Sequence, residues 1–262
     1  MITNKIILVA IAATHLSLNA SIDNYFPYKI EPSASNYGVT GIYEIPNARF
    51  MKAGSMRFSF SSSYPNEFTG LSASPFEWFE AGYRYAEVKN LLYSDTPSYS
   101  GNQSLKDKGF DIKVRVLKEN QLTPAIAFGL RDIAGTGRFS SEYIVATKQH
   151  DNWDITAGIG WGLLGSEGSI SNPISFLNDS FKTRGGKTGG EGGAFNSTSW
   201  FTGKAALFGG LEYKLRRYGL NFKLEYDTSN PDEGINPFSV DSRFNLGLEY
   251  HAFKNLNFGL SF

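Results

Sequence analysis

The sequence predicts an all-β protein, a transmembrane antiparallel up-and-down β-barrel of about 10 to 12 strands. Apolar and polar residues alternate over most of the chain, which places every second side chain on the same face of a strand. The alternating segments are about 9 to 12 residues long, as tilted membrane strands require, whereas soluble strands centre on about 5 or 6. No segment carries a helical apolar stripe of about 12 residues or more.

Composition argues against several other classes of protein. The chain of 262 residues contains no cysteine, which excludes a disulfide scaffold, a zinc ribbon and a thiol nucleophile. Its 25 Lys+Arg and 25 Asp+Glu residues balance, whereas nucleic-acid-binding proteins carry a basic surplus, so we expect no nucleic-acid partner. A hydrophobic fraction of 41% argues against a disordered chain. A mean hydropathy of -0.27 and the lack of an apolar run of about 18 residues argue against a helical membrane protein.

The N-terminus has the pattern of a signal peptide. Lys5 precedes an apolar run at 6–13, and a stretch of small and polar residues leads to an expected cleavage position after Ala20. A buried N-terminal strand or helix is the alternative. Because a secreted chain without cysteine fits a bacterial envelope, we expect export to the outer membrane of a Gram-negative bacterium. The predicted organisation is a signal peptide at 1–20, an N-terminal periplasmic segment at 21–36 and the barrel at 37–262.

The expected strands follow one another along the chain. The clearest alternation lies at 108–118, where apolar residues at even positions alternate with charged residues such as Asp111 and Lys113. The same period recurs at 153–162, 218–226 and 244–250. Further strands are expected at 39–45, 55–62, 77–87, 124–132, 138–148, 203–215 and 254–262.

Alternation alone does not show which face meets water, because a soluble sandwich or a lipocalin-like barrel alternates as well. Aromatic residues at both ends of the apolar face favour the membrane. Trp153 and Trp161 share this face, and at about 3.3 Å per residue and a tilt of about 40° they are separated by about 20 Å along the barrel axis, which suits two interfacial girdles. The expected girdle residues, in contact with outer-membrane lipid, are Trp153, Trp161, Tyr218, Tyr226 and Tyr250.

The opposite face combines charged residues with glycine and alanine, and we expect it to line a barrel lumen. Its positive and negative side chains nearly balance, which predicts cross-strand pairing because an unpaired buried charge is costly. The expected network consists of Arg57, Glu80, Arg84, Asp111, Lys113, Arg115, Arg131, Glu142, Asp154, Glu212, Lys214, Lys223, Glu225, Arg243 and Glu249. A filled lumen of this size argues against an open conduit, because porins with a water-filled channel have about 16 strands. In a soluble barrel the same charges would be solvated.

The lengths of the links give a test of topology. Short links are expected near 119–121, 150–151, 216–217 and 252–253, and long links at 89–107, 164–202 and 228–240. In outer-membrane barrels short turns face the periplasm and long loops face outside. Counting 39–45 as the first strand places all the long links outside, but it gives an odd number of strands. The sequence therefore predicts either that a strand is missing after Phe262 or that 39–45 lies outside the barrel.

No motif predicts a catalytic residue, a metal site or a cofactor. The glycine-rich stretch 185–193 resembles a phosphate loop, but Phe181 stands where the P-loop spacing needs glycine. No His, Asp and Glu cluster has metal-ligand spacing. The acidic loop 227–234 could hold Ca²⁺ but does not match an EF-hand, and a plain turn is the simpler interpretation. His251 has lumen parity, which leaves a Ser–His pair open.

Several stretches carry a family resemblance. They are 35–51 (SNYGVTGIYEIPNARFM), 80–85 (EAGYRY), 107–119 (DKGFDIKVRVLKE), 124–148 (PAIAFGLRDIAGTGRFSSEYIVATK), 154–166 (DITAGIGWGLLGS), 205–213 (AALFGGLEY) and 221–227 (NFKLEYD). As an ordered series they resemble the YjbH (YbjH) family, the exopolysaccharide-biosynthesis outer-membrane proteins of Gram-negative bacteria. The similarity runs from about residue 35 to the C-terminus.

The resemblance implies a non-enzymatic outer-membrane barrel that assists exopolysaccharide production or export. Its implied partners are periplasmic and outer-membrane export proteins and the polysaccharide itself. It implies no catalytic residue and no cofactor. Family members are usually longer, and some look like lipoproteins, which this chain without cysteine does not. A passive small-solute porin and an outer-membrane lipid hydrolase are the alternatives. Candidates for stacking on sugars in the long links are Tyr93, Tyr99, Trp200 and Phe201.

Overall fold

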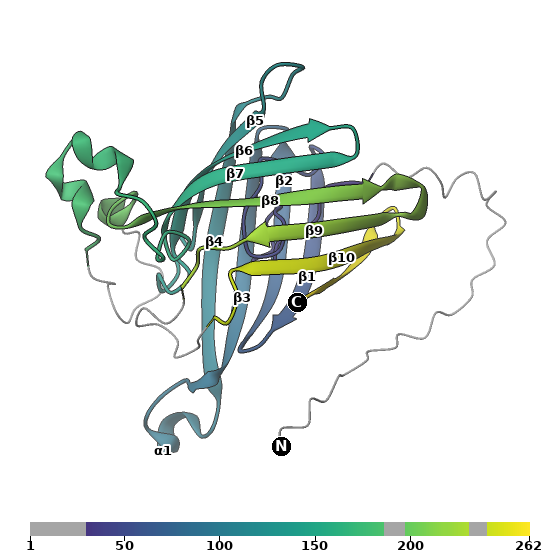
Figure 1. Ribbon diagram of the computed structural model, residues 1–262. Helices are drawn as coiled ribbons and strands as arrows, with labels where there is room; N and C mark the ends of the chain where they lie inside the picture. Colours follow the sequence, from purple (N-terminus) through teal and green to yellow (C-terminus); the bar gives the residue numbers. More distant parts are fainter. Residues whose placement is uncertain (1–29, 186–196, 231–239) are drawn as a thin grey trace, which may run out of the picture.

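The computed structural model describes residues 30–185, 197–230 and 240–262 (Figure 1). In these residues the chain forms one antiparallel sheet of 11 strands, which follow the order of the sequence. The strands are β1 (Ser55–Ser63), β2 (Asn66–Phe76), β3 (Phe79–Leu92), β4 (Ser104–Leu117), β5 (Ala125–Arg131), β6 (Ser141–His150), β7 (Trp153–Gly162), β8 (Ala205–Leu215), β9 (Leu220–Tyr226), β10 (Phe244–Phe253) and β11 (Leu256–Ser261). The expected all-β, up-and-down antiparallel order is confirmed. The expected signal peptide at 1–20 lies outside the described residues.

Helical structure is limited to single turns in the links between strands. These turns are α1 (Pro97–Ser100), η2 (Pro173–Phe176), η3 (Asp179–Lys182), η4 (Ser197–Ser199) and η5 (Arg216–Tyr218). Pro97 and Pro173 stand in the first turn of their helices, where the missing N–H costs no hydrogen bond. In the part of the chain that the structure describes, no helix is long and apolar enough to cross a membrane.

The sheet has an apolar outer face and a polar inner face. In β1, Met56, Phe58 and Phe60 point outward, and Phe58 is 72% exposed. The alternate residue Arg57 points inward, where its guanidinium donates to the hydroxyl of Thr40 at 3.1 Å. Most other strands keep this alternation, as expected for a period of two. Strand β11 is exposed on both faces, and the inner faces of β5 and β6 also carry apolar side chains. This polarity is the reverse of a soluble sandwich, in which the apolar face is buried.

The inner face of the sheet curves around residues 30–52, which we call the inner segment (Figure 1). The amide of Thr40 donates to Glu80 in β3, that of Ala48 to Thr147 in β6, and that of Tyr43 to Glu225 in β9. Strands so far apart in the sheet can meet one short segment only if the sheet curls around it.

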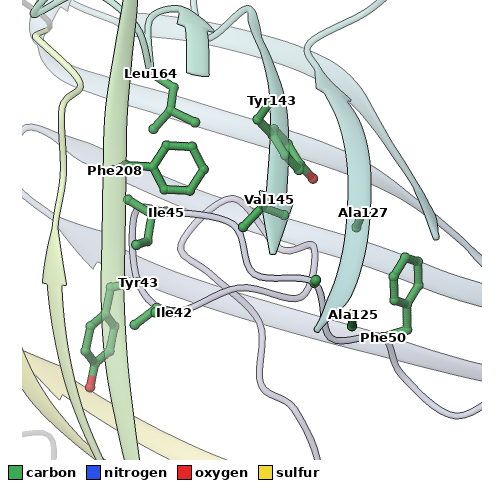
Figure 2. Packing of buried hydrophobic residues seen from close by; sticks show 11 residues of the cluster. Ile42, Tyr43, Ile45, Phe50, Ala125, Ala127, Tyr143, Val145, Leu164 and Phe208 are labelled. Carbon is green, nitrogen blue, oxygen red and sulfur yellow. The ribbon is translucent and has the colours of Figure 1, made fainter. Parts of the chain in front are cut away.

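Apolar side chains of the inner segment pack against the middle strands (Figure 2). The cluster consists of Ile42, Tyr43, Ile45, Ala48, Phe50, Ala125, Ala127, Tyr143, Val145, Leu164 and Phe208. Ile42 and Ile45 are fully buried, and burial of each such side chain contributes about 1.5 to 3 kcal/mol. Glycine makes room for the segment, because a Cβ on Gly210 would lie 2.5 Å from the Cδ1 of Ile42.

The strand predictions fail at two places: one predicted strand is absent and one observed strand was not predicted. The two failures leave the number of strands unchanged. Residues 39–45 are not a strand, because they form turns with isolated bridges such as Ala34 to Thr40 and Gly41 to Pro46. Conversely, β2 has no counterpart among the expected strands. Its inner positions are mostly small residues such as Gly70 and Ser72, so the contrast between its two faces is weak in the sequence.

The long links gather at one edge of the sheet, as the sequence predicts. In an up-and-down sheet the links β3–β4, β7–β8 and β9–β10 leave from the same edge, whereas the short links β2–β3, β6–β7 and β10–β11 lie at the other. The odd number of strands means that β1 and β11 run in the same direction. In the described residues these two strands share no ladder, so the sheet is not closed into a barrel.

Candidate functional site

The inner segment and the charged inner face of the sheet together form the candidate functional site. Buried or half-buried on this face are Arg57, Glu80, Arg84, Asp111, Lys113, Arg115, Arg131, Asp154, Glu212, Lys214, Lys223, Glu225, Arg243 and Glu249. They come from strands on every side of the inner segment, and the two-residue period of each strand directs them toward it.

Carboxylates of the sheet bind backbone N–H groups of the inner segment. Glu225 accepts from the amides of Tyr43 at 2.9 Å, Glu44 at 2.8 Å and Ile45 at 3.3 Å. Glu80 accepts from both the amide and the hydroxyl of Thr40, at 2.8 Å and 2.9 Å. A segment without a strand ladder must find other acceptors for its amides, and these two carboxylates supply them.

Cations of the sheet bind carbonyl oxygens of the same segment. The Lys113 ammonium donates to the carbonyl of Thr40 at 2.8 Å and to that of Arg49 at 2.6 Å. Arg131 donates to the carbonyl of Glu44 at 2.9 Å. Lys113 also lies 3.4 Å from Glu80, so the two residues form an ion pair. This ion pair holds the segment at Thr40, where Glu80 accepts from the amide and Lys113 donates to the carbonyl. These hydrogen bonds to charged groups are stronger than neutral ones.

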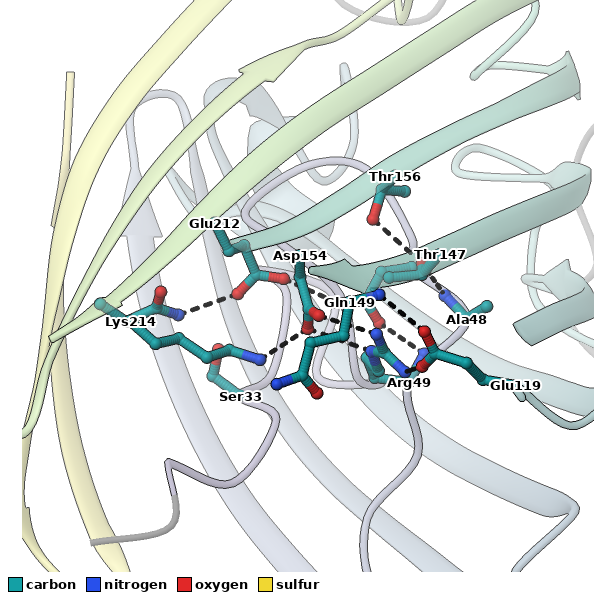
Figure 3. Close-up of polar contacts among 12 residues, drawn as sticks. Ser33, Ala48, Arg49, Glu119, Thr147, Gln149, Asp154, Thr156, Glu212 and Lys214 are labelled. Atoms are coloured by element: carbon teal, nitrogen blue, oxygen red, sulfur yellow. Dashed lines mark hydrogen bonds and ion pairs between the residues drawn. The ribbon is translucent and has the colours of Figure 1, made fainter. Parts of the chain in front are cut away.

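Arg49 is the inner segment's own contribution to the charge network (Figure 3). Its guanidinium makes a bidentate contact with Asp154 in β7, at 3.0 Å and 2.7 Å, and a further one with Glu119 at 2.5 Å. The ammonium of Lys214 in β8 lies 2.5 Å from Oδ2 of Asp154, which also accepts from Nε of Arg49. Arg49 therefore joins the short-link edge of the sheet to the inner segment.

A second charge cluster lies toward the edge with the long links. Arg84 is buried and lies 3.2 Å from Asp111 in the neighbouring strand and 3.8 Å from Asp132 in the β5–β6 link. The rings of Tyr37 and Phe139 lie 5.4 Å and 5.0 Å from its guanidinium carbon. Buried arginine is stabilised here by two carboxylates and two aromatic faces at once.

The Oε1 of Glu44 in the inner segment accepts from the side-chain amide of Asn36 at 2.6 Å. Burial, together with the nearby carboxylates of Asp227 and Glu225, raises the pKa of Glu44 to about 7. The side chain can therefore change its charge near neutral pH.

Glu142 does not face the interior, which corrects its predicted place in the lumen network. In β6 the side chains of Tyr143 and Val145 pack into the inner cluster, so Glu142 and Ile144 point outward. Glu142 is nevertheless buried, because Arg184 of the β7–β8 link donates to it at 2.8 Å and 2.9 Å. The link folds back over this part of the outer face.

The same link covers Trp161, whose predicted exposure in a girdle is wrong. Trp161 lies opposite Glu142 in the ladder and is only 1% exposed. Its indole N–H donates to Asn172 at 3.0 Å, and Phe201 packs edge-on against the ring at 5.1 Å. A non-local contact with the link determines the surroundings of this residue.

The other expected girdle residues lie on the outer surface. Trp153, Tyr218 and Tyr250 are exposed near the short links. Tyr226 lies at the opposite end of β9. Its hydroxyl donates to Glu167 at 3.2 Å, and Glu167 covers part of the tyrosine ring. Tyr218 is in the turn η5 rather than in a strand.

The structure places several of the remaining candidate residues from the sequence. No group of three or more His, Asp or Glu side chains is placed there to hold a metal ion. His251 lies 3.7 Å from Glu249. Tyr93 and Tyr99 stack on one another, with ring centroids 6.4 Å apart, and Phe201 packs on the protein. The glycine-rich stretch beyond residue 185 and the acidic loop at 231–234 lie outside the described residues.

Sequence reasoning missed the inner segment and the residues through which it is held. Arg49 and Glu119 carry charge into the network but lie in no alternating stretch, and Glu44 lies in 39–45, which the sequence wrongly predicts to be a strand. One signal could have revealed the segment. Gly38, Gly41, Pro46 and Asn47 interrupt 35–49 too often for a membrane strand, although the stretch is rich in apolar residues.

Comparisons with known proteins agree on one relationship. The family described as "YjbH: Exopolysaccharide biosynthesis protein YbjH" matches residues 33–262. A protein of Escherichia coli (strain K12) named "Uncharacterized lipoprotein YjbH" is 34% identical over 238 residues, which is 90% of this chain and 34% of that protein. The chain thus spans about a third of the length of that relative. No solved structure matches the chain.

Replacement of Arg49 by methionine tests whether the charge network holds the inner segment. Arg49→Met keeps the aliphatic stem of the side chain but removes the bidentate partner of buried Asp154. We expect a loss on the order of 2 kcal/mol in the free energy of unfolding, because Asp154 loses two hydrogen bonds to a charged group and keeps only Lys214 as its cation among the described residues. Urea unfolding in detergent micelles measures it. The control Lys118→Met breaks an exposed ion pair with Glu77 and should change little; equal effects of both variants would contradict the assignment.

The titration of Glu44 predicts a pH-dependent stability. Because its pKa of about 7 in the folded protein lies above the ordinary value of 4.5, ionisation opposes folding. The contribution of the protonated carboxyl is complete below pH 4.5 and is lost as the pH rises through about 7. Glu44→Gln, which cannot ionise, should therefore gain stability relative to the wild type between pH 4.5 and pH 8.

Unfolding midpoints at these two pH values check this expectation. The exposed Glu77→Gln serves as the control for removing a carboxylate from the outer surface. A difference between Glu44→Gln and the wild type that stays constant from pH 4.5 to pH 8 would show that Glu44 does not titrate in this range.

Proposed function

The chain belongs to the YjbH family of exopolysaccharide biosynthesis proteins, and we propose that it is a non-enzymatic outer-membrane β-barrel that assists exopolysaccharide production or export. One observation carries the membrane part of this proposal. The sheet exposes apolar side chains on its outer face and buries charged side chains on its inner face. Such polarity suits a lipid solvent and a polar interior.

The outer face carries exposed apolar side chains in most strands of the sheet. Exposed apolar residues in successive strands include Phe58, Leu71, Phe110, Ile144, Ile155, Leu207, Phe222, Leu246 and Phe258. Soluble monomers rarely expose contiguous apolar patches larger than a few hundred Å². Lipid covers such a surface without cost, and the ladders between strands satisfy the backbone groups that lipid cannot.

The aromatic residues near the short links support an interfacial position for that edge. Trp153 and Tyr213 pack with ring centroids 4.6 Å apart at the end of the β7–β8 ladder, and Tyr250 is exposed in β10. Amphipathic rings of this kind concentrate at the level of the lipid headgroups. We propose that this edge faces the periplasm and that the long links face outside.

Closure of the barrel is a further part of the proposal. β1 and β11 run in the same direction, so one strand of the opposite direction would pair antiparallel with both edges. In lipid the unpaired N–H and C=O groups of an open edge cost several kcal/mol each, which favours such a closing strand.

The inner segment bears on what the barrel transports. It crosses the interior and is bound there through Glu225, Glu80 and Lys113, which supports the proposal that the protein is not a free conduit for a polymer. This weighs against the passive porin as well. We propose that the protein acts through its long links and through partners among the periplasmic and outer-membrane export proteins. The word lipoprotein in the name of the Escherichia coli relative fits an envelope location.

A charge on the outer face tests the membrane proposal. Leu246 lies in β10 and is 58% exposed, and an arginine at the bilayer midplane costs about 2 to 4 kcal/mol. Leu246→Arg should reduce the amount of protein in the outer-membrane fraction and of heat-modifiable folded species on gels. Ser180→Arg, an equal change in the exposed turn η3, should reduce neither. A soluble periplasmic wild-type protein would contradict the proposal.

Deletion of the gene tests the role in polysaccharide output. We expect secreted polysaccharide to fall relative to the cell-retained amount, and complementation by the wild type but not by Leu246→Arg to restore it. Purified protein in planar bilayers should show little steady current, because the inner segment fills the interior. Unchanged secretion in the deletion strain would contradict the function, and a large steady conductance would favour the porin.

A further inference from the structure

A cavity of about 150 Å³ opens at the edge of the sheet where the long links gather. The inner segment contributes Tyr37 and Glu44 to its wall, and β2 contributes Phe68. The β5–β6 link adds Phe139, and the β9–β10 link adds Asp227. The inner segment thus completes a pocket whose other walls are parts of the chain far apart in the sequence.

One side of the cavity is a cluster of aromatic rings. The ring centroid of Tyr37 lies 5.2 Å from that of Phe68 and 6.0 Å from that of Phe139, and the two phenylalanine rings are 5.4 Å apart. All three side chains are buried, and Arg131 lies over the Tyr37 ring at 4.2 Å. This side is rigid and apolar, as expected for the wall of a ligand site.

The other side of the cavity is polar and acidic. Glu44 and Asp227 line it, and burial raises the pKa of both carboxyls. Among the described residues that line the cavity, Arg138 is the one with a positive charge. The amide of Asn245 and the hydroxyl of Ser242 also line it, and exposed Ser242 and Tyr64 mark the mouth. The polar groups supply several acceptors for hydroxyl donors within one small space.

We propose that this cavity binds one uncharged sugar unit, an inference that rests on the proposed role in exopolysaccharide output. The C–H face of a pyranose packs on aromatic rings, while its hydroxyls donate to carboxylate oxygens, so the two sides of the cavity match the two sides of a sugar. A protein cavity of about 150 Å³ accommodates a six-membered ring. Among the described residues, the two lining carboxyls of Glu44 and Asp227 outnumber the one lining guanidinium, that of Arg138, so the cavity disfavours a uronic acid or a phosphorylated sugar and favours neutral and N-acetylated units.

Binding to purified full-length protein in detergent micelles tests the proposal. The probes are cellotetraose, the tetramer of N-acetylglucosamine and tetragalacturonate. Saturation-transfer NMR and calorimetry measure the binding of each probe. We expect binding of at least one uncharged probe and none of the acidic one. Ser242→Trp fills the mouth from an exposed position and should weaken this binding about tenfold or more, and Asp227→Asn should weaken it through lost hydrogen-bond acceptors.

Matched controls lie in the turn η3, away from the lining residues. Asp179→Asn and Ser180→Trp repeat the two changes at exposed positions and should leave binding unchanged. Heat-modifiable migration confirms that each variant is folded, and Ser242→Trp, at an exposed position, keeps the test valid if Asp227→Asn does not fold. The proposal is overturned if no uncharged probe binds, if tetragalacturonate binds equally well, or if Ser242→Trp binds like the wild type.

The sugar site and the proposed function can fail separately. Normal secretion in the deletion strain would contradict the function, while uncharged-probe binding that Ser242→Trp abolishes would still support the site. Conversely, the deletion strain could secrete less polysaccharide and regain full secretion when it expresses Ser242→Trp. If the purified protein also bound no probe, these results would overturn the site and leave the function standing.

Discussion

Charged side chains can be buried on the inner face of this sheet only because each finds a partner, and the inner segment supplies many of them. The segment has no strand ladder, so its backbone amides and carbonyls need partners as well. Glu225 accepts from three consecutive amides, and Lys113 donates to two carbonyls of the same segment. Without the segment the sheet would hold uncompensated charges, and without the sheet the segment would hold unpaired backbone groups.

The strands were predictable from the sequence wherever the two faces differ strongly in polarity. β4 alternates apolar residues with Asp111, Lys113 and Arg115, and its expected and observed positions agree closely. β2 escaped prediction because a face lined by Gly70 and Ser72 gives no charge signal, although the strand needs small residues there. The apolar residues of 39–45 suggested a strand, but this stretch consists of turns whose side chains pack individually into the core. Periodicity alone does not distinguish such turns from a strand.

Parity along the strands predicted the inner face, because the direction of a side chain in a strand is a local property. It failed at Glu142, where the charged residue shares a face with Ile144 and the neighbouring Tyr143 points inward. The burial of Glu142 and Trp161 depends on Arg184 and Asn172 from a distant link, which no local pattern encodes. The cavity was out of reach for the same reason, since its walls meet only in the folded protein.

The position of the inner segment also has a consequence for the order of folding. It precedes all 11 strands in the chain, yet Tyr43 and Glu225 are separated by 182 residues. Contacts of such range form slowly, because closing a long loop costs conformational entropy before any contact compensates for it. The contacts of the segment with β3 and β4 span far fewer residues than its contacts with β9, so we expect the segment to be held first from the side of the early strands and last from the side of β9.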